Sequence, residues 1–283
     1  MTTRYDAVVP AGGAARRLGG ADKPALTVGG QRLLDRVLAA CAGARATVVV
    51  GPRRPTVRPV RWTREAPAGG GPLPALAAGL AALPTADAAL GAAPAVVLVL
   101  AADLPFLTRA ATDALLGALD AHDALDGDGA GTGYGAGTGS VPRVAEPRPA
   151  EPGPAEPGPA EPGPAPARRH EQEWDGVMLV DANGRDQPLA AAYRVEPLRR
   201  ELALLGAEHG SLTGLPLRLL TGELTLRRIA DPTGDASFDC DTWEDVAAAR
   251  ARLGTEPHAE PHAEPHGGPG TQPHRETGGE SAG

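Results

Sequence analysis

AVVPAGGAARRLGGADKPAL, residues 7–26, is the stretch that decides the fold class. Its apolar start ends at Pro10 and is followed by glycines at positions 12, 13, 19 and 20. Such a pattern is typical of a buried strand that leads into a loop whose backbone approaches a ligand closely. Lys23 is the only lysine among the 27 Lys and Arg residues of the chain. Because lysine is a compact point charge and arginine a planar fork, the stretch favours a phosphate-binding loop.

An ordinary strand-to-helix loop is the alternative interpretation, because the chain holds 38 glycines. The loop matches neither the Walker A pattern nor the GxGxxG dinucleotide pattern. Arg16, Arg17 and Lys23 nevertheless surround the glycines with three cations. This combination favours a triphosphate as the ligand.

Strand-like and helix-like segments alternate along the chain. The predicted strands are Tyr5–Pro10, Ala46–Val50, Val60–Thr63, Ala95–Leu100, Gly176–Val180, Pro188–Tyr193, Leu217–Leu220 and Thr225–Ile229. The predicted helices are Arg32–Cys41, Leu73–Leu83, Ala110–Ala121, Pro197–Leu205 and Trp243–Leu253. The alternation predicts an α/β fold with a mostly parallel sheet flanked by helices. In such sheets ligands bind beyond the carboxyl ends of the strands.

Two low-complexity regions contain almost no apolar residues to bury. AEPGP pentads occur within residues 122–175, and EPHA repeats occur within residues 254–283. We therefore predict one domain over residues 1–253, interrupted by a disordered insertion at 122–175 and followed by a disordered tail at 254–283. The two regions hold 15 of the 35 acidic residues but only 5 of the 27 Lys and Arg residues. The remainder is close to neutral, which disfavours nucleic-acid binding.

The sequence has no run approaching the roughly 20 apolar residues of a membrane span. No signal-peptide pattern stands at the N-terminus either, so we expect a cytoplasmic protein with no membrane partner. Cys41 lies in a helical pattern and Cys240 beside acidic residues. These unlike settings predict free thiols rather than a disulfide.

A carboxylate follows the apolar run VVLVLAADLPFL, residues 96–107. Asp103 comes directly after the predicted buried strand, where an unpaired carboxylate would be costly. Mg²⁺ is usually held by one or two carboxylates together with substrate phosphates. Asp103 is therefore a candidate magnesium ligand, and a helix N-cap or a plain loop residue is the alternative.

Two further acids occur in FDCDTWEDVAAAR, residues 238–250. Asp239 and Asp241 alternate along what we predict to be a short strand, so both would point to one face. Either is a candidate second metal ligand, and solvated acids before a helix are the alternative. Thr242 and Asp245 have the spacing of a capping box.

Histidine chemistry is disfavoured. His209 is the only histidine outside the two low-complexity regions. His258, His262 and His266 recur every four residues, but each follows a proline, which prevents the helix that would bring them together.

Five segments, in chain order, resemble the MobA-like molybdenum cofactor guanylyltransferases among the nucleotidyltransferases. They are PAGGAARRLGGADK (10–23), GGGPLPALAAGL (69–80), AADLPF (101–106), GRDQPLAAAYR (184–194) and FDCDTWEDV (238–246). The resemblance implies a Rossmann-like nucleotidyltransferase fold. It also implies Mg²⁺-dependent transfer of GMP from GTP to molybdopterin-bound molybdenum, with release of pyrophosphate.

The resemblance also implies site residues and partners. The catalytic residues would be Lys23, Arg17 and Asp103, and the metal ligands Asp103 and Asp241. The nucleotide would be lined by Ala11, Gly12, Gly13, Lys23, Glu65, Gly71, Pro72, Leu73 and Asp103. The molybdopterin side would be formed by Gln187, Pro188 and Leu189. Besides these small-molecule substrates, transient contacts with molybdoenzymes or other cofactor-synthesis proteins are expected.

The chain departs from the family pattern at several positions. Pro10, Gly51 and Trp243 replace the family's Leu, Asn and Pro, and Glu65 stands only near the position of its Asp. A molybdopterin cytidylyltransferase or a sugar-phosphate nucleotidyltransferase is therefore one alternative. A non-catalytic nucleotide-binding relic whose Pro-rich arms recruit a partner is the other.

Overall fold

The computed structural model describes residues 3–13, 16–85, 91–127 and 174–254. The strands in these residues are β1 Tyr5–Pro10, β2 Thr27–Val28, β3 Gln31–Arg32, β4 Thr47–Val50, β5 Arg61–Thr63, β6 Val96–Leu100, β7 Gly176–Val180, β8 Asp186–Arg194 and β9 Leu226–Ala230. The α-helices are α1 Leu33–Ala40, α2 Pro72–Ala81, α3 Arg109–Gly127, α4 Val195–His209, α5 Leu217–Glu223 and α6 Trp243–Arg252. Two short 3₁₀ helices, η1 Arg16–Leu18 and η2 Lys23–Ala25, lie in the loop after β1.

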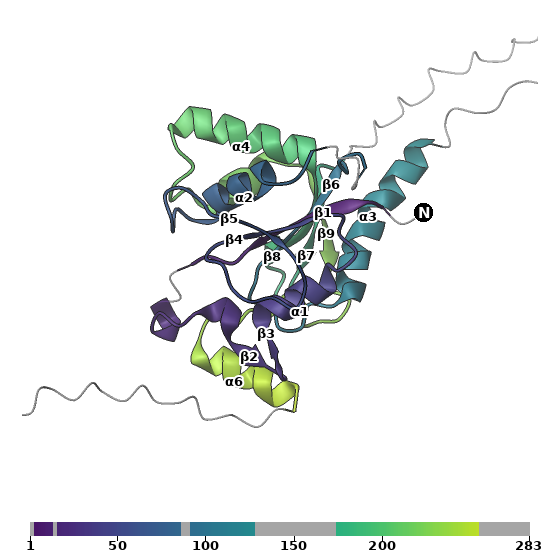
Figure 1. Ribbon diagram of the computed structural model, residues 1–283. Coiled ribbons are helices and arrows are strands. Elements are labelled where there is room, and N and C mark those ends of the chain that lie inside the picture. The colour runs from purple at the N-terminus through teal and green to yellow at the C-terminus, as the bar shows by residue number, and fades with distance from the viewer. Residues whose placement is uncertain (1–2, 14–15, 86–90, 128–173, 255–283) are drawn as a thin grey trace, which may run out of the picture.

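Seven strands form one sheet in the order β5-β4-β1-β6-β8-β7-β9 (Figure 1). β1 is central and pairs in parallel with β4 and with β6. Only β8 runs antiparallel to its neighbours, β6 and β7, within this part of the chain. The mostly parallel sheet flanked by helices agrees with the predicted α/β fold, and it gathers the carboxyl ends of β1, β4 and β6 at one edge.

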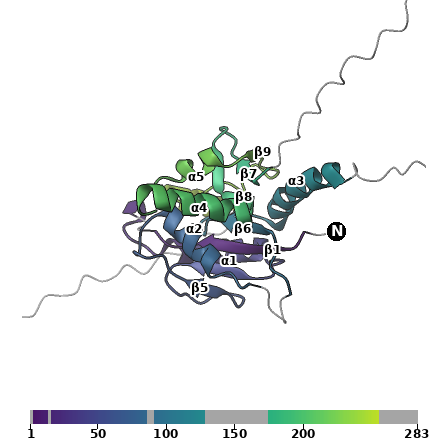
Figure 2. The ribbon, with the colours of Figure 1, turned by 90° about the horizontal axis from the view of Figure 1, so that it is seen from above.

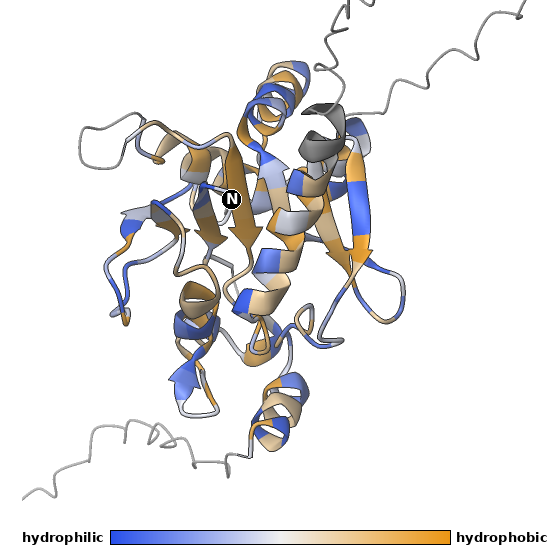
Figure 3. Ribbon diagram, turned by 90° about the vertical axis from the view of Figure 1, so that its right-hand side faces the viewer, coloured by the Kyte–Doolittle hydropathy of each residue, from blue (hydrophilic) through white to orange (hydrophobic). Residues whose placement is uncertain are grey.

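Helices cover both faces of the sheet (Figures 1 and 2). Alternate residues of β1 point to opposite faces, so Ala7 and Val9 pack with α1 and α3, while Val8 packs with α2 and α4. Figure 3 shows the strands as largely hydrophobic and the helices as polar on their outer sides. The buried side chains thus form two clusters, one on each face of the sheet. Both clusters exclude water from the sheet, which makes it a rigid support for the loops at its edge.

A third, smaller cluster joins the loop after β1 to the C-terminal segment. Leu18, Leu26 and Val28 pack with Val246 and Ala249 of α6. α6 begins with the predicted capping box, in which the Thr242 side chain accepts a hydrogen bond from the Asp245 amide. This cluster places residues 238–241 beside the glycine-rich loop.

Most of the predicted elements are confirmed within one to four residues at their ends, but two predictions are wrong. Leu217–Leu220, predicted as a strand, lies in helix α5. Residues 238–241, predicted as a short strand, have no regular structure. The short hairpin of β2 and β3 was not predicted.

The boundaries of the predicted insertion need correction. Helix α3 continues to Gly127, beyond the predicted start at residue 122. At the other end, Trp174 and Asp175 are held by hydrogen bonds from Arg194 and Thr225. Residues 128–173 and 255–283, on which the rest of that prediction falls, lie outside the described residues.

The cysteines and the helix lengths agree with the sequence analysis. Cys41 and Cys240 are both buried free thiols, as predicted. Over the described ranges, every helix is too short or too polar to be a membrane span.

Candidate active site

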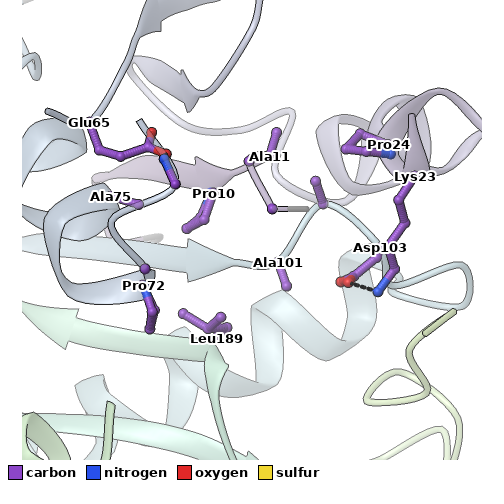
Figure 4. A pocket seen from close by; sticks show the side chains of 15 residues that line it. Pro10, Ala11, Lys23, Pro24, Glu65, Pro72, Ala75, Ala101, Asp103 and Leu189 are labelled. Carbon is purple, nitrogen blue, oxygen red and sulfur yellow. Dashed lines mark hydrogen bonds and ion pairs between the residues drawn. The ribbon is translucent and has the colours of Figure 1, made fainter. Parts of the chain in front are cut away.

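A cavity of about 400 Å³ opens at the carboxyl ends of β1 and β6 (Figure 4). Its walls come from the loop after β1, the start of η2, the loop before α2, the end of β6 and Leu189 of β8. Most of this surface is glycine, alanine and proline, and its charged side chains are Lys23, Glu65 and Asp103. The three charges come from segments far apart in sequence, and the parallel sheet brings them to one edge.

The loop after β1 approaches the neighbouring strand ends closely. Gly13 has φ 137°, a conformation that side chains strongly disfavour. A Cβ on Gly51, which follows β4, would lie 2.9 Å from the carbonyl oxygen of Ala11. The glycine at position 51 is therefore required for the close packing of these two backbone segments.

Lys23 is held between two carboxylates. Its Nζ lies 2.5 Å from Asp103 Oδ2 and 2.5 Å from Asp241 Oδ1. Burial alone would lower the pKa of the Lys23 ammonium. The charges of Asp103 and Asp241, and the hydrogen bonds to them, outweigh burial and raise that pKa above its ordinary value. Lys23 is therefore fully charged at neutral pH.

Asp103 retains an unused acceptor. Its Oδ2 binds Lys23, whereas its Oδ1 is buried and has no hydrogen-bond partner among the described residues. A buried carboxylate oxygen without a partner is costly, and a hard cation or a ligand donor would remove that cost. Asp103, with the half-exposed carboxylate of Asp241 across Lys23, therefore fits a magnesium site.

Asp241 reaches this cluster through a loop rather than through the predicted strand. The Cys240 amide donates to the carbonyl oxygen of Asp103 at 3.3 Å, which docks the loop against the end of β6. Burial, followed by the charges of Asp241 and Asp103, raises the pKa of the Asp239 carboxyl. Asp241 contacts Lys23, and no such contact is formed by Asp239 in the described structure. The geometry thus favours Asp241 as the second carboxylate.

Cys240 has no role as a nucleophile here. Its thiol is fully buried. Burial, followed by the charge of Asp103, raises its pKa to about 12. The thiol therefore stays protonated at neutral pH.

Glu65 lies at the opposite end of the cavity from the Lys23–Asp103 pair (Figure 4). It is only 8% exposed, and its Oε1 accepts a hydrogen bond of 2.9 Å from the Gly69 amide. Its Oε2 is buried without a partner among the described residues. Glu65 thus offers a fixed carboxylate with one free oxygen to a ligand that carries N–H donors.

The structure brings most of the sequence-derived candidates to the cavity. Those that line it are Ala11, Gly12, Gly13, Lys23, Glu65, Gly71, Pro72, Asp103 and Leu189. Arg17 stays outside, with its guanidinium 3.8 Å from Asp241 and its side chain 74% exposed. Leu73, the second residue of α2, does not line the cavity, because its side chain is fully buried in the core.

Two residues expected on the acceptor side are occupied elsewhere. Gln187 lies 3.4 Å from Asp181, to which its amide donates. The carbonyl oxygen of Pro188 accepts a hydrogen bond from the Tyr193 hydroxyl. Leu189 is the member of that trio that lines the cavity in the described structure.

Several cavity residues were missed by the sequence analysis. They are the small and apolar residues Pro10, Pro24, Gly69, Ala75, Ala101 and Ala102. Most stand within four positions of a predicted site residue, so proximity to the motifs was the available signal. Their side chains carry no chemistry of their own, which is why residue type did not identify them.

The N-terminal half of the chain is similar to a known protein family. Residues 7–133 match the model of the MobA-like NTP transferase domain. The match spans 127 of the 283 residues, and this segment is similar to that family. The matched residues include the glycine-rich loop, Glu65 and Asp103. No curated protein matches the chain.

Solved structures show the same fold at low sequence identity. Molybdopterin-guanine dinucleotide biosynthesis protein A from Archaeoglobus fulgidus superposes with a TM-score of 0.53 at 15% identity, covering 88% of this chain and 98% of that one. The 2-C-methyl-D-erythritol 4-phosphate cytidylyltransferase from Thermus thermophilus superposes with a TM-score of 0.51 at 15% identity, covering 90% and 100%. The two act with different nucleotides by name, so the likeness shows the nucleotidyltransferase fold alone.

Proposed function

We propose that the protein transfers GMP from GTP to the terminal phosphate of molybdopterin that carries molybdenum, and releases pyrophosphate. The observation that carries this proposal is one cavity with two different ends. One end holds Lys23 and Asp103, with Asp241 bound to Lys23 outside the cavity lining, and the other end holds Glu65 with a free oxygen. The first end suits a polyphosphate, and the second suits a base with two adjacent N–H donors.

Guanine is the base that Glu65 suits best. Its N1–H and N2–H₂ groups stand side by side on one edge and could donate to the free Oε2 of Glu65 and to the second lone pair of Oε1, whose other lone pair holds the Gly69 amide. Cytosine, adenine and uracil each present only one kind of donor on that edge, next to ring or carbonyl acceptors that a carboxylate repels. Glu65 therefore supports guanine over the other bases.

The chemistry requires two polyanions to approach each other. An oxygen of the acceptor phosphate attacks the α-phosphorus of GTP, a new P–O bond forms, and the bond to the β-phosphate bridging oxygen breaks. The acceptor phosphate is largely ionised at neutral pH, so no protein base is needed. The task of the protein is to position the two substrates and offset their charge.

Lys23 is suited to this task because its ammonium is charged and almost buried. We propose that it exchanges a carboxylate partner for phosphate oxygens when the triphosphate binds. The glycine-rich loop would offer backbone N–H groups to the same phosphates, and Arg17 at the rim would add a further charge. When bound, Mg²⁺ would neutralise phosphate charge, and Asp103 and Asp241 are the residues that would hold it.

A thermal-shift panel of GTP, CTP, ATP and UTP, each with Mg²⁺, tests the nucleotide. Ligand binding stabilises the fold by RT ln(1 + [L]/Kd), so the preferred base gives the largest shift at equal concentration. We expect GTP to rank first. If CTP ranks first, the protein is a cytidylyltransferase, and the guanine assignment is wrong. If none of the four shifts the transition, the proposed nucleotide binding is wrong, whereas a shift without transfer in the acceptor assay would favour the non-catalytic nucleotide-binding relic.

The acceptor needs a separate assay. Molybdopterin carrying molybdenum, GTP and the protein should give pyrophosphate and the guanine dinucleotide in equal amounts. A sugar 1-phosphate serves as the competing acceptor. Turnover with the sugar phosphate and none with the pterin would overturn the proposed acceptor.

A further inference from the structure

Asp22 directly precedes Lys23, and its side chain does not cap the short helix η2. It stands at the N-cap position of η2, where an aspartate side chain normally accepts a helix N–H. No such hydrogen bond is present. Both carboxylate oxygens of Asp22 instead accept from Arg54 Nε at 2.8 Å, and Arg54 Nη2 lies 2.6 Å from Oδ1. The carboxylate beside Lys23 is therefore committed to an arginine from another loop.

Arg54 is placed to act as a fixed partner. Its side chain is 12% exposed, whereas the side chain of Asp22 is 51% exposed. Arg54 Nη1 also donates 2.8 Å to the carbonyl oxygen of Pro52, which orients the guanidinium within its own loop. A guanidinium held in this way loses less conformational freedom on pairing than a mobile surface arginine. The pair thus joins a half-exposed carboxylate to a guanidinium that its own loop already orients.

The loop that carries Arg54 touches the glycine-rich loop at two places. At its start, Gly51 packs against Ala11 and Gly12, so closely that a Cβ would collide with the backbone. Further along, Arg54 binds Asp22. The loop is anchored in turn by Arg32, whose Nη1 donates 2.9 Å to the carbonyl oxygen of Pro55. Residues 51–55 therefore connect the beginning and the end of the glycine-rich loop.

We propose that Arg54 is a positioning residue for Lys23, acting through Asp22. This inference rests on the proposed nucleotidyl transfer and concerns the same site. Arg54 has two effects on that site. It fixes the backbone from which Lys23 reaches Asp103, and it neutralises a carboxylate that would otherwise repel an incoming triphosphate. Arg54 itself does not line the cavity.

The test uses the triphosphate that stabilises the wild-type protein most in the panel above, with Mg²⁺. Arg54→Gln should raise its Kd about tenfold, the order of effect expected for coupled neighbouring residues. Arg54→Lys should recover part of the loss, because an ammonium can still pair with Asp22. The melting temperature of the nucleotide-free protein should change by about 3 °C or less.

Arg32→Gln is the matched control. It removes an arginine contact to the same loop, at Pro55, without touching Asp22. If Arg54 only anchored its own loop, Arg32→Gln would weaken nucleotide binding equally. We expect the Kd of this control to stay within about twofold of the wild-type value.

A double-mutant cycle with Lys23→Met separates positioning from general stability. If Arg54 acts through Lys23, Arg54→Gln should cost much less affinity in the Lys23→Met background than in the wild type. Equal losses in both backgrounds, or no loss from Arg54→Gln, would overturn the inference while leaving the proposed function intact. A wild-type protein that binds none of the four triphosphates would overturn both.

Discussion

The two ends of the cavity carry different charges. At the phosphate end, Lys23 is already paired with Asp103 and Asp241, so positive and negative charges offset one another before any ligand arrives. At the base end, Glu65 keeps one buried oxygen without a partner among the described residues. Each end therefore keeps one buried carboxylate oxygen without a partner among the described residues, Asp103 Oδ1 and Glu65 Oε2, and the two ends differ in that only the Lys23 end also carries a cation.

In the proposed function, this difference separates the reaction from the choice of base. Any nucleoside triphosphate presents the same phosphates to the Lys23 end, so that end does not distinguish bases. In the same proposal, the Glu65 end would meet only the base. Changes at the first end should affect all nucleotides alike, whereas changes at the second should alter their ranking.

Asp103→Asn should have the largest effect. It keeps the side-chain size but removes the charge on the carboxyl group at the end of β6, so we expect at least a hundredfold loss of Mg²⁺-dependent transfer with every nucleotide. Steady-state assays and a melting curve of the same sample measure this. Asp113→Asn, an exposed carboxylate paired with Arg109 on α3, is the control that should remain active. Unfolding of Asp103→Asn would show instead that the carboxylate is structural.

Lys23→Arg should lower kcat/KM by about tenfold or more, again for all nucleotides. The ammonium lies 2.5 Å from each of two carboxylates in a site where it is only 13% exposed, and a planar guanidinium does not fit that position. Lys23→Met, which removes the charge as well, should be worse. Wild-type turnover from Lys23→Arg would show that charge alone suffices.

Glu65→Gln should act on one nucleotide only. The neutral amide keeps an acceptor but loses the charge and presents an N–H to the base, so GTP affinity should fall about tenfold while CTP affinity changes little. Titration of both nucleotides with Mg²⁺ measures the ratio. Glu201→Gln serves as control, because Glu201 is equally buried but lies on α4, away from the cavity. A parallel loss for both nucleotides would assign Glu65 a structural role.

Thr242→Ala should have the smallest effect. It removes the capping box at the start of α6, next to Asp241, at a cost of about 1 kcal/mol in unfolding free energy. The expected fall in melting temperature is about 2–4 °C. Thr221→Ala, within α5, should not lower it, since alanine is the better helix former. A larger fall with lost transfer would mean that the cap also positions Asp241.

Much of the fold could be predicted because strong patterns persist over whole elements. Strands β1 and β6 are nearly continuous runs of buried residues, and helix α1 places its apolar residues on one face. Residues 217–220 were misassigned, because four residues of mostly leucine satisfy a strand and a helix equally well. In the structure these residues lie in helix α5, and Leu220 packs into the buried cluster that contains Val8, α2 and α4.

The sequence by itself determined that a glycine-rich loop with one lysine and a carboxylate after a buried strand would meet, because parallel strands share one carboxyl edge. It also determined which residue types stand there. Only the tertiary structure decided their partners. Lys23 pairs across 218 residues with Asp241, and Asp22 pairs with Arg54 from another loop. A local sequence pattern indicates which face of a helix or strand is buried. Whether two loops touch depends instead on where the packed core places the ends of the strands and helices that they join.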